Sequence, residues 1–111
     1  MKTEQITLVT SIIAAHDFSA SKNVFVGFGG DLCADGAKAL GVLIDTTISG
    51  EQAPVAVSGI ALITSGEAIT VGEALSSDAN GKAVAVGADV LNGYALDAAS
   101  AADELIRILL A

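Results

Sequence analysis

The longest strand candidate in the chain is Val55-Ala56-Val57-Ser58-Gly59-Ile60-Ala61-Leu62-Ile63-Thr64. This composition favours extended backbone, because β-branched side chains pack well on a pleated sheet. Gly59 stands in the middle of the run, where glycine weakens a strand and indicates a bulge or a sharp bend. Small barrels turn their corners with bends of this kind. The run therefore predicts a long strand that bends at Gly59.

The segment that follows this strand predicts a hairpin. Ser77-Asp78-Ala79-Asn80-Gly81-Lys82 separates two short apolar runs, 74–76 and 83–86. Asn-Gly between such runs is a strong signal for a tight turn, since both residues tolerate positive φ. Further short apolar runs, bounded by glycines and polar residues, cover 6–13, 23–28, 40–44 and 94–98. The pattern predicts an all-β fold, a small barrel or sandwich of short antiparallel strands.

The segment 98–111 allows two interpretations. Ser100 and Asp103 resemble a capping box in front of apolar residues with helical spacing, which indicates a short C-terminal helix. However, Gly59-Ile60-Ala61-Leu62 recurs as Gly93-Tyr94-Ala95-Leu96, and each copy is followed by a turn with a glutamate and then an apolar run. That parallel favours a C-terminal hairpin, with the short helix as the alternative.

Length and charge limit the class of protein. At 111 residues we expect one core, divided into an N-terminal arm or strand (1–20) and a single β-barrel domain (21–111). The formal net charge is −8, and residues 39–111 carry nine of the 13 acidic side chains. Nucleic acids and anionic membranes attract basic proteins, so we expect neither as a partner.

Residues that carry chemistry are sparse. His16, the single histidine, lies in a polar stretch, and Cys33, the single cysteine, has no cation beside it in the sequence that would lower the pKa of its thiol. Asp78-Ala79-Asn80-Gly81 begins like a calcium loop but lacks the remaining oxygen ligands. We therefore expect no catalytic residue, no metal site and no cofactor, and a protein that is not an enzyme.

Two alternative functions remain open at this point. The stretch Gly72-Glu73-Ala74-Leu75, followed by Gly81-Lys82-Ala83-Val84, resembles a biotinyl or lipoyl carrier domain, in which a lysine at a hairpin tip carries the cofactor. In that alternative Lys82 is the attachment residue, although such carriers have an acidic residue or Met directly beside the lysine. The other alternative is an oligomeric module that binds a small ligand.

From Leu40 onward the sequence resembles a family of tailed-bacteriophage capsid decoration (cement) proteins. The matching stretches are Leu40-Gly41-Val42-Leu43, 53–60, 65–73, 77–84, 93–102 and 105–110. The family has Gly where this chain has Asp103, in the turn before the last apolar run. The resemblance implies a small β-barrel on the outer surface of an icosahedral head. It also implies a homotrimer that binds the major capsid protein at three-fold positions, stabilises the expanded shell, and is made in the host cytoplasm before joining the virion.

The N-terminal segment is the expected contact surface, because it is apolar and close to neutral. Residues 1–38 carry three cations and four anions. Such a segment suits strand addition or apolar docking. The alternative is that its side chains fill the core. The residues expected at a capsid or trimer interface are Ile6, Leu8, Ile12, Ile13, Phe18, Phe25 and Phe28.

Overall fold

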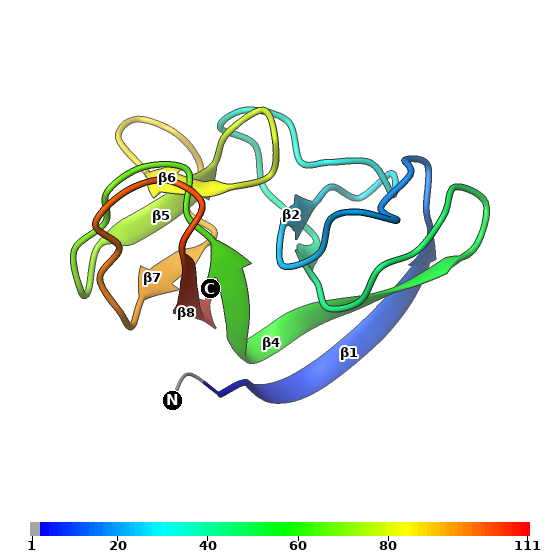
Figure 1. The fold of residues 1–111 in the computed structure, drawn as a ribbon, viewed down its shortest axis with the longest axis horizontal. Coiled ribbons are helices and arrows are strands. Elements are labelled where there is room, and N and C mark those ends of the chain that lie inside the picture. Colours follow the sequence, from blue (N-terminus) through cyan, green and yellow to red (C-terminus); the bar gives the residue numbers. More distant parts are fainter. Residues whose placement is uncertain (1–2) are drawn as a thin grey trace.

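The computed structural model describes residues 3–111, which form an all-β fold without helices (Figure 1). Every pair of neighbouring strands is antiparallel, and the sheet curls into a nearly closed barrel. This confirms the predicted fold class. The strands are β1 (Gln5–Ile13), β2 (Phe25–Val26), β3 (Gly41–Leu43), β4 (Gln52–Thr64), β5 (Ala74–Ser77), β6 (Ala83–Ala85), β7 (Gly93–Ala95) and β8 (Leu105–Leu110).

β4, with 13 residues, organises the whole sheet. Ala56 pairs with Val9 of β1 and also with Val42 of β3, so these two strands lie on opposite edges of β4. Ile60 likewise pairs with both β1 and β8. β1 therefore occupies one edge of β4, and β3 and then β8 occupy the other edge in succession. The path continues from β8 through β7 and β5 to β6.

The predicted bend is present: β4 turns sharply part-way along its length (Figure 1), and Gly59 lies in the middle of the strand with a positive φ. Gly59 has φ +96°, a backbone conformation that residues with a Cβ rarely adopt. The register with β1 shifts on both sides of Leu8, which shows an irregular ladder at the same place. A Cβ at Gly59 would lie 2.5 Å from the carbonyl oxygen of Gln5. The bend thus depends on the absence of a side chain.

The predicted Asn-Gly hairpin connects β5 and β6. The amide of Asp78 donates to the carbonyl of Lys82 over 2.9 Å, and Gly81 has φ +75°. The carboxylate of Asp78 accepts hydrogen bonds from the amides of Asn80 and Lys82. A parallel bridge between Ser65 and Ala83 then joins the end of β4 to β6, so the strands β4-β8-β7-β5-β6 form a nearly closed ring.

The C-terminal segment is a strand of the hairpin formed with β7, as predicted; the alternative of a short helix is wrong. Tyr94 pairs with Leu109, and Ala95 pairs with Ile108. Asp103, in the turn before β8, adopts φ +66°, the conformation that a glycine would take most easily. Aspartate visits this region more readily than most residues because its short side chain can bond locally.

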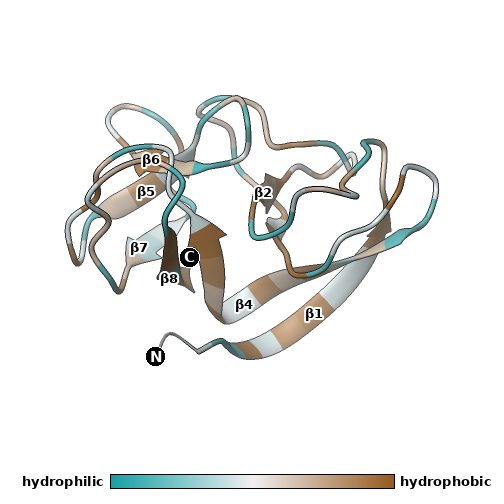
Figure 2. Ribbon diagram, viewed as in Figure 1, coloured by the Kyte–Doolittle hydropathy of each residue, from teal (hydrophilic) through white to brown (hydrophobic). Residues whose placement is uncertain are grey.

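Two clusters of buried side chains form the core. The larger cluster joins strands of the ring to β2 and β3 and contains Phe25, Val42, Leu75, Ile106 and Ile108 together with several alanines. The smaller cluster lies under the segment 14–24 and includes Phe18, Val24, Leu43 and Ala53. Small side chains suit these positions because strands and turns approach each other closely. β1 lies at the margin of the fold, with brown apolar bands along its ribbon (Figure 2).

Candidate functional site

The expected interface residues fall into three groups in the structure. Phe18 and Phe25 are completely buried, so in this fold they are core residues and offer no surface to a partner. Their burial follows the alternative in which N-terminal aromatics fill the core. Ile6 and Ile12 are partly buried and pack against the two clusters. The remaining residues, Leu8, Ile13 and Phe28, are exposed by 57, 51 and 65%.

The exposed group extends along β1. Val9, which was not among the expected interface residues, is 47% exposed and lies between Leu8 and the C-terminal half of the strand. The register with β4 shifts on both sides of Leu8, so the regular alternation of faces is interrupted there, and Leu8 and Val9 are two adjacent exposed apolar residues. The β-branched run 6–13 indicated an apolar strand, but it could not indicate which of its side chains the rest of the chain would cover.

The backbone edge of β1 that faces away from β4 is also without a paired strand among residues 3–111. Among residues 3–111, the strand that pairs with β1 is β4, on one side only. A free edge offers backbone N–H and C=O groups to another strand, and proteins usually protect such edges with charged side chains, proline or short length. β1 is nine residues long and contains no charged residue and no proline. It therefore has the chemistry of a strand that receives a partner.

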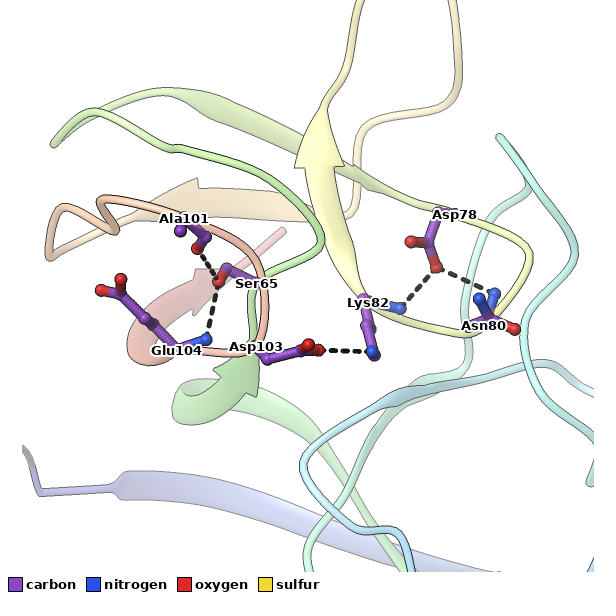
Figure 3. Close-up of polar contacts among 7 residues, drawn as sticks. All are labelled: Ser65, Asp78, Asn80, Lys82, Ala101, Asp103 and Glu104. Atoms are coloured by element: carbon purple, nitrogen blue, oxygen red, sulfur yellow. Dashed lines mark hydrogen bonds and ion pairs between the residues drawn. The ribbon is translucent and has the colours of Figure 1, made fainter.

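A second candidate site is polar and lies where the end of β4 meets β6 to close the ring, a place we call the seam (Figure 3). The Ser65 hydroxyl donates to the carbonyl of Ala101 over 2.8 Å and accepts from the amide of Glu104 over 3.0 Å. The Ser65 carbonyl accepts from the amide of Asp103 over 2.8 Å. Since Ser65 also bridges to Ala83, one residue ties the turn before β8 to the start of β6.

Lys82 belongs to this seam. Its ammonium group pairs with the carboxylate of Asp103, and this hydrogen bond raises the pKa of Lys82 (Figure 3). A raised pKa leaves less of the neutral amine that acylation requires. The tip of the hairpin is formed by residues 79–80, and Lys82 lies beyond the tip, directly before β6. The geometry supports a structural role for Lys82 and does not favour the carrier-domain alternative.

Other reactive groups are isolated. His16 Nδ1 lies 3.4 Å from the Asp31 carboxylate, and its ring packs on Phe18. Cys33 is buried, and desolvation raises the pKa of its thiol. Within residues 3–111 no group of three or more His, Cys, Asp or Glu side chains is placed to hold a metal ion. The same residues contain no helix long and apolar enough to cross a membrane.

A depression of about 270 Å³ lies beside the segment that covers the smaller cluster. It is lined by Ser19, Thr46, Thr47, Ile48 and Glu51. Ligand sites are mostly apolar clefts with a few convergent polar groups and span roughly 300–1,000 Å³. The small size and polar lining of this depression do not favour the small-ligand alternative.

The sequence model for phage cement proteins matches residues 2–110, nearly the whole chain. The chain belongs to the phage cement protein family. Membership places it among the structural proteins associated with phage heads, and this confirms the resemblance seen in the sequence.

Comparison with solved structures supports the fold of this cement family member. The chain resembles the head fiber gp8.5 N base of bacteriophage phi29 with a TM-score of 0.74 at 17% sequence identity. The match covers 94% of this chain and 95% of the phi29 chain. At this identity the likeness shows a shared fold. The search of curated proteins finds no match.

Proposed function

We propose that this protein decorates the outer surface of a phage head at three-fold positions, as a homotrimer bound to the major capsid protein, and stabilises the expanded shell. Membership of the cement family carries this proposal. The action is non-catalytic and needs no cofactor. A protein that binds the expanded lattice and not its precursor stabilises that lattice in proportion to ln(1 + [L]/Kd), where [L] is the free protein concentration.

The N-terminal segment supports the proposal as the surface that meets the shell or another copy. Its exposed apolar residues, Leu8, Val9, Ile13 and Phe28, belong to the part of the chain with little net charge. Most acidic residues lie in 39–111, which we expect to face solvent. The division into an arm (1–20) and a barrel (21–111) stays a prediction, and the burial of Phe18 ties the end of that arm to the core.

The charge of the protein is consistent with an outer-surface location in the virion. With a net charge of −8, the protein would be repelled by packaged genome inside the shell and by anionic membranes. We therefore propose neither nucleic acid nor membrane as a partner. Synthesis in the host cytoplasm followed by addition to finished heads is the corresponding assembly route.

Binding to purified heads tests the proposal. The protein is mixed with undecorated expanded heads and with unexpanded heads, and the pelleted fraction is measured after sedimentation. We expect saturable binding to expanded heads, a higher melting temperature of those heads, and a particle mass in light scattering of three chains or a multiple of three. Failure to bind any head would overturn the function, and a monomer that binds would overturn the trimer alone.

A pair of matched variants locates the contact. Leu8→Arg and Val71→Arg each place a cation on an exposed apolar residue, one on β1 and one in the loop between β4 and β5. We expect Leu8→Arg to weaken head binding at least tenfold and Val71→Arg to leave it unchanged. If the two variants bind heads with equal affinity, β1 neither contacts the shell nor maintains the oligomeric state that binds the shell.

A further inference from the structure

β1 is the long free edge of the sheet in residues 3–111. The second edge of β6 is bridged to Ser65, and the second edge of β2 is bridged to Leu32. The strands β3, β5, β7 and β8 each lie between two others. If two copies paired through two different strands, each copy would need two strands with a free edge. Because one long edge is available, strand pairing between copies must join β1 to β1.

The sequence of β1 is close to a palindrome about Val9. In an antiparallel pair of two β1 strands centred on Val9, Ile6 lies opposite Ile12, and Thr7 lies opposite Ser11. Leu8 then lies opposite Thr10, and Val9 lies opposite the same residue of the second copy. Three of the five distinct pairs join side chains of like character, namely Ile6 with Ile12, Thr7 with Ser11 and Val9 with itself, and such pairs are favourable across strands, whereas Gln5 meets Ile13 at the ends of the strand.

Charges near the strand agree with this register. Like charges directly opposite each other destabilise a pair of strands. Within Gln5–Ile13 there are no charges, and the nearest described acid, Glu4, falls opposite Ala14 of the second copy. The paired strands themselves therefore bring no two like charges directly opposite each other.

We propose that β1 pairs antiparallel with β1 of a second copy of this chain about a two-fold axis at Val9, which joins the two sheets into one. A two-fold contact is self-complementary and uses the same patch on both copies. It is separate from the three-fold contact of the proposed trimer and requires no shell, so it would connect one trimer to the next. The pairing would also cover Leu8 and Val9.

Disulfide trapping tests the axis directly. In Val9→Cys the two thiols would face each other across the pair, with Cβ atoms about 4.5–5.5 Å apart, close to what a disulfide requires. In Ile13→Cys, an equally exposed site on the same strand, the two thiols would be eight residues out of register, or roughly 26 Å apart. Cys33 is buried, so the unmodified chain serves as the background control.

We expect mild oxidation to convert at least half of Val9→Cys to a covalent dimer, with Ile13→Cys and the unmodified chain remaining monomeric on non-reducing gels. Equal trapping of both variants, or of neither, would overturn the proposed axis. A second measurement is independent of thiol geometry. Val9→Lys places two ammonium groups opposite each other, and we expect the particle mass in light scattering to fall twofold while circular dichroism stays unchanged.

Head binding of the unmodified protein separates this proposal from the function proposed above, on which it does not depend. Trapping of Val9→Cys together with saturable head binding of the unmodified protein supports both. Trapping without head binding would overturn the cement function alone, and head binding without any Val9→Cys dimer would overturn the pairing between copies alone.

Discussion

Replacing Gly59 with alanine tests whether the bend of β4 holds the fold together. At φ +96° a residue with a Cβ is strained by about 1–3 kcal/mol. The new methyl group would also lie 2.5 Å from the Gln5 carbonyl oxygen and 2.8 Å from the Thr7 amide nitrogen, both backbone atoms of β1 that move only if the strand moves. Overpacking of this kind adds about 1–3 kcal/mol. We therefore expect Gly59→Ala to lose about 4 kcal/mol of unfolding free energy.

Gly50→Ala is the matched control. Gly50 has φ +90°, but a Cβ there would have no atom within 4 Å, so this variant carries the backbone strain without the clash. Urea unfolding followed by circular dichroism, at several protein concentrations, gives both free energies. We expect Gly59→Ala to be less stable than Gly50→Ala by about 1–3 kcal/mol and to exchange its β1 amides faster. Equal losses, within about 0.5 kcal/mol, would refute the argument that β1 holds the bend by close approach.

Three further outcomes follow from burial and hydrogen bonding. Phe18→Ala is expected to lose about 3–5 kcal/mol in urea unfolding and exposed Phe28→Ala less than about 0.5 kcal/mol, and equal losses would show that Phe18 is not a core residue. The buried Ser76 hydroxyl has no hydrogen-bond partner within residues 3–111, so we expect Ser76→Ala to raise the free energy of unfolding by about 1 kcal/mol. Ser65→Ala removes two hydrogen bonds and should lower the free energy of unfolding by about 1–3 kcal/mol. The reverse order of stabilities would contradict the structural role given to Ser65. Burial raises the pKa of the Cys33 thiol above its ordinary 9.0 in the folded state, so its contribution to the free energy of unfolding is full below pH 9 and declines as the pH rises through the folded pKa. Urea unfolding from pH 8 to 11 should show this decline. Rapid labelling of Cys33 by a thiol reagent at pH 8 would contradict its burial.

Features set by neighbouring residues were predictable from the sequence. The Asn80-Gly81 hairpin follows from two residues that accept positive φ, and the bend of β4 follows from a glycine in a long apolar run. The C-terminal hairpin was decided by an internal parallel against a plausible helical spacing. Asp103 shows why that choice was close, since a non-glycine residue holds the left-handed turn.

Features set by distant contacts were not predictable. Phe18 and Phe28 are both aromatic residues of the N-terminal third, yet one is fully buried and the other largely exposed. The difference depends on which segments cover them in the fold. Asn92 is a further example, because Asn92-Gly93 has the same letters as the hairpin turn. Its buried side chain instead accepts from the amide of Ala39 and donates to the carbonyl of Ala37, more than 50 residues away.

The position of β8 has a consequence for how the protein is made. β8 lies between β4 and β7, so the ring cannot close until residue 110 has left the ribosome. Until then the growing chain exposes one edge of β4 along Ile60–Thr64 and the apolar surface that Ile106 and Ile108 later cover. Distant strand pairing of this kind folds slowly and leaves aggregation-prone surface exposed. Closure of the ring therefore waits for the synthesis of β8, and a ribosome-bound chain that ends before β8 should recruit chaperones.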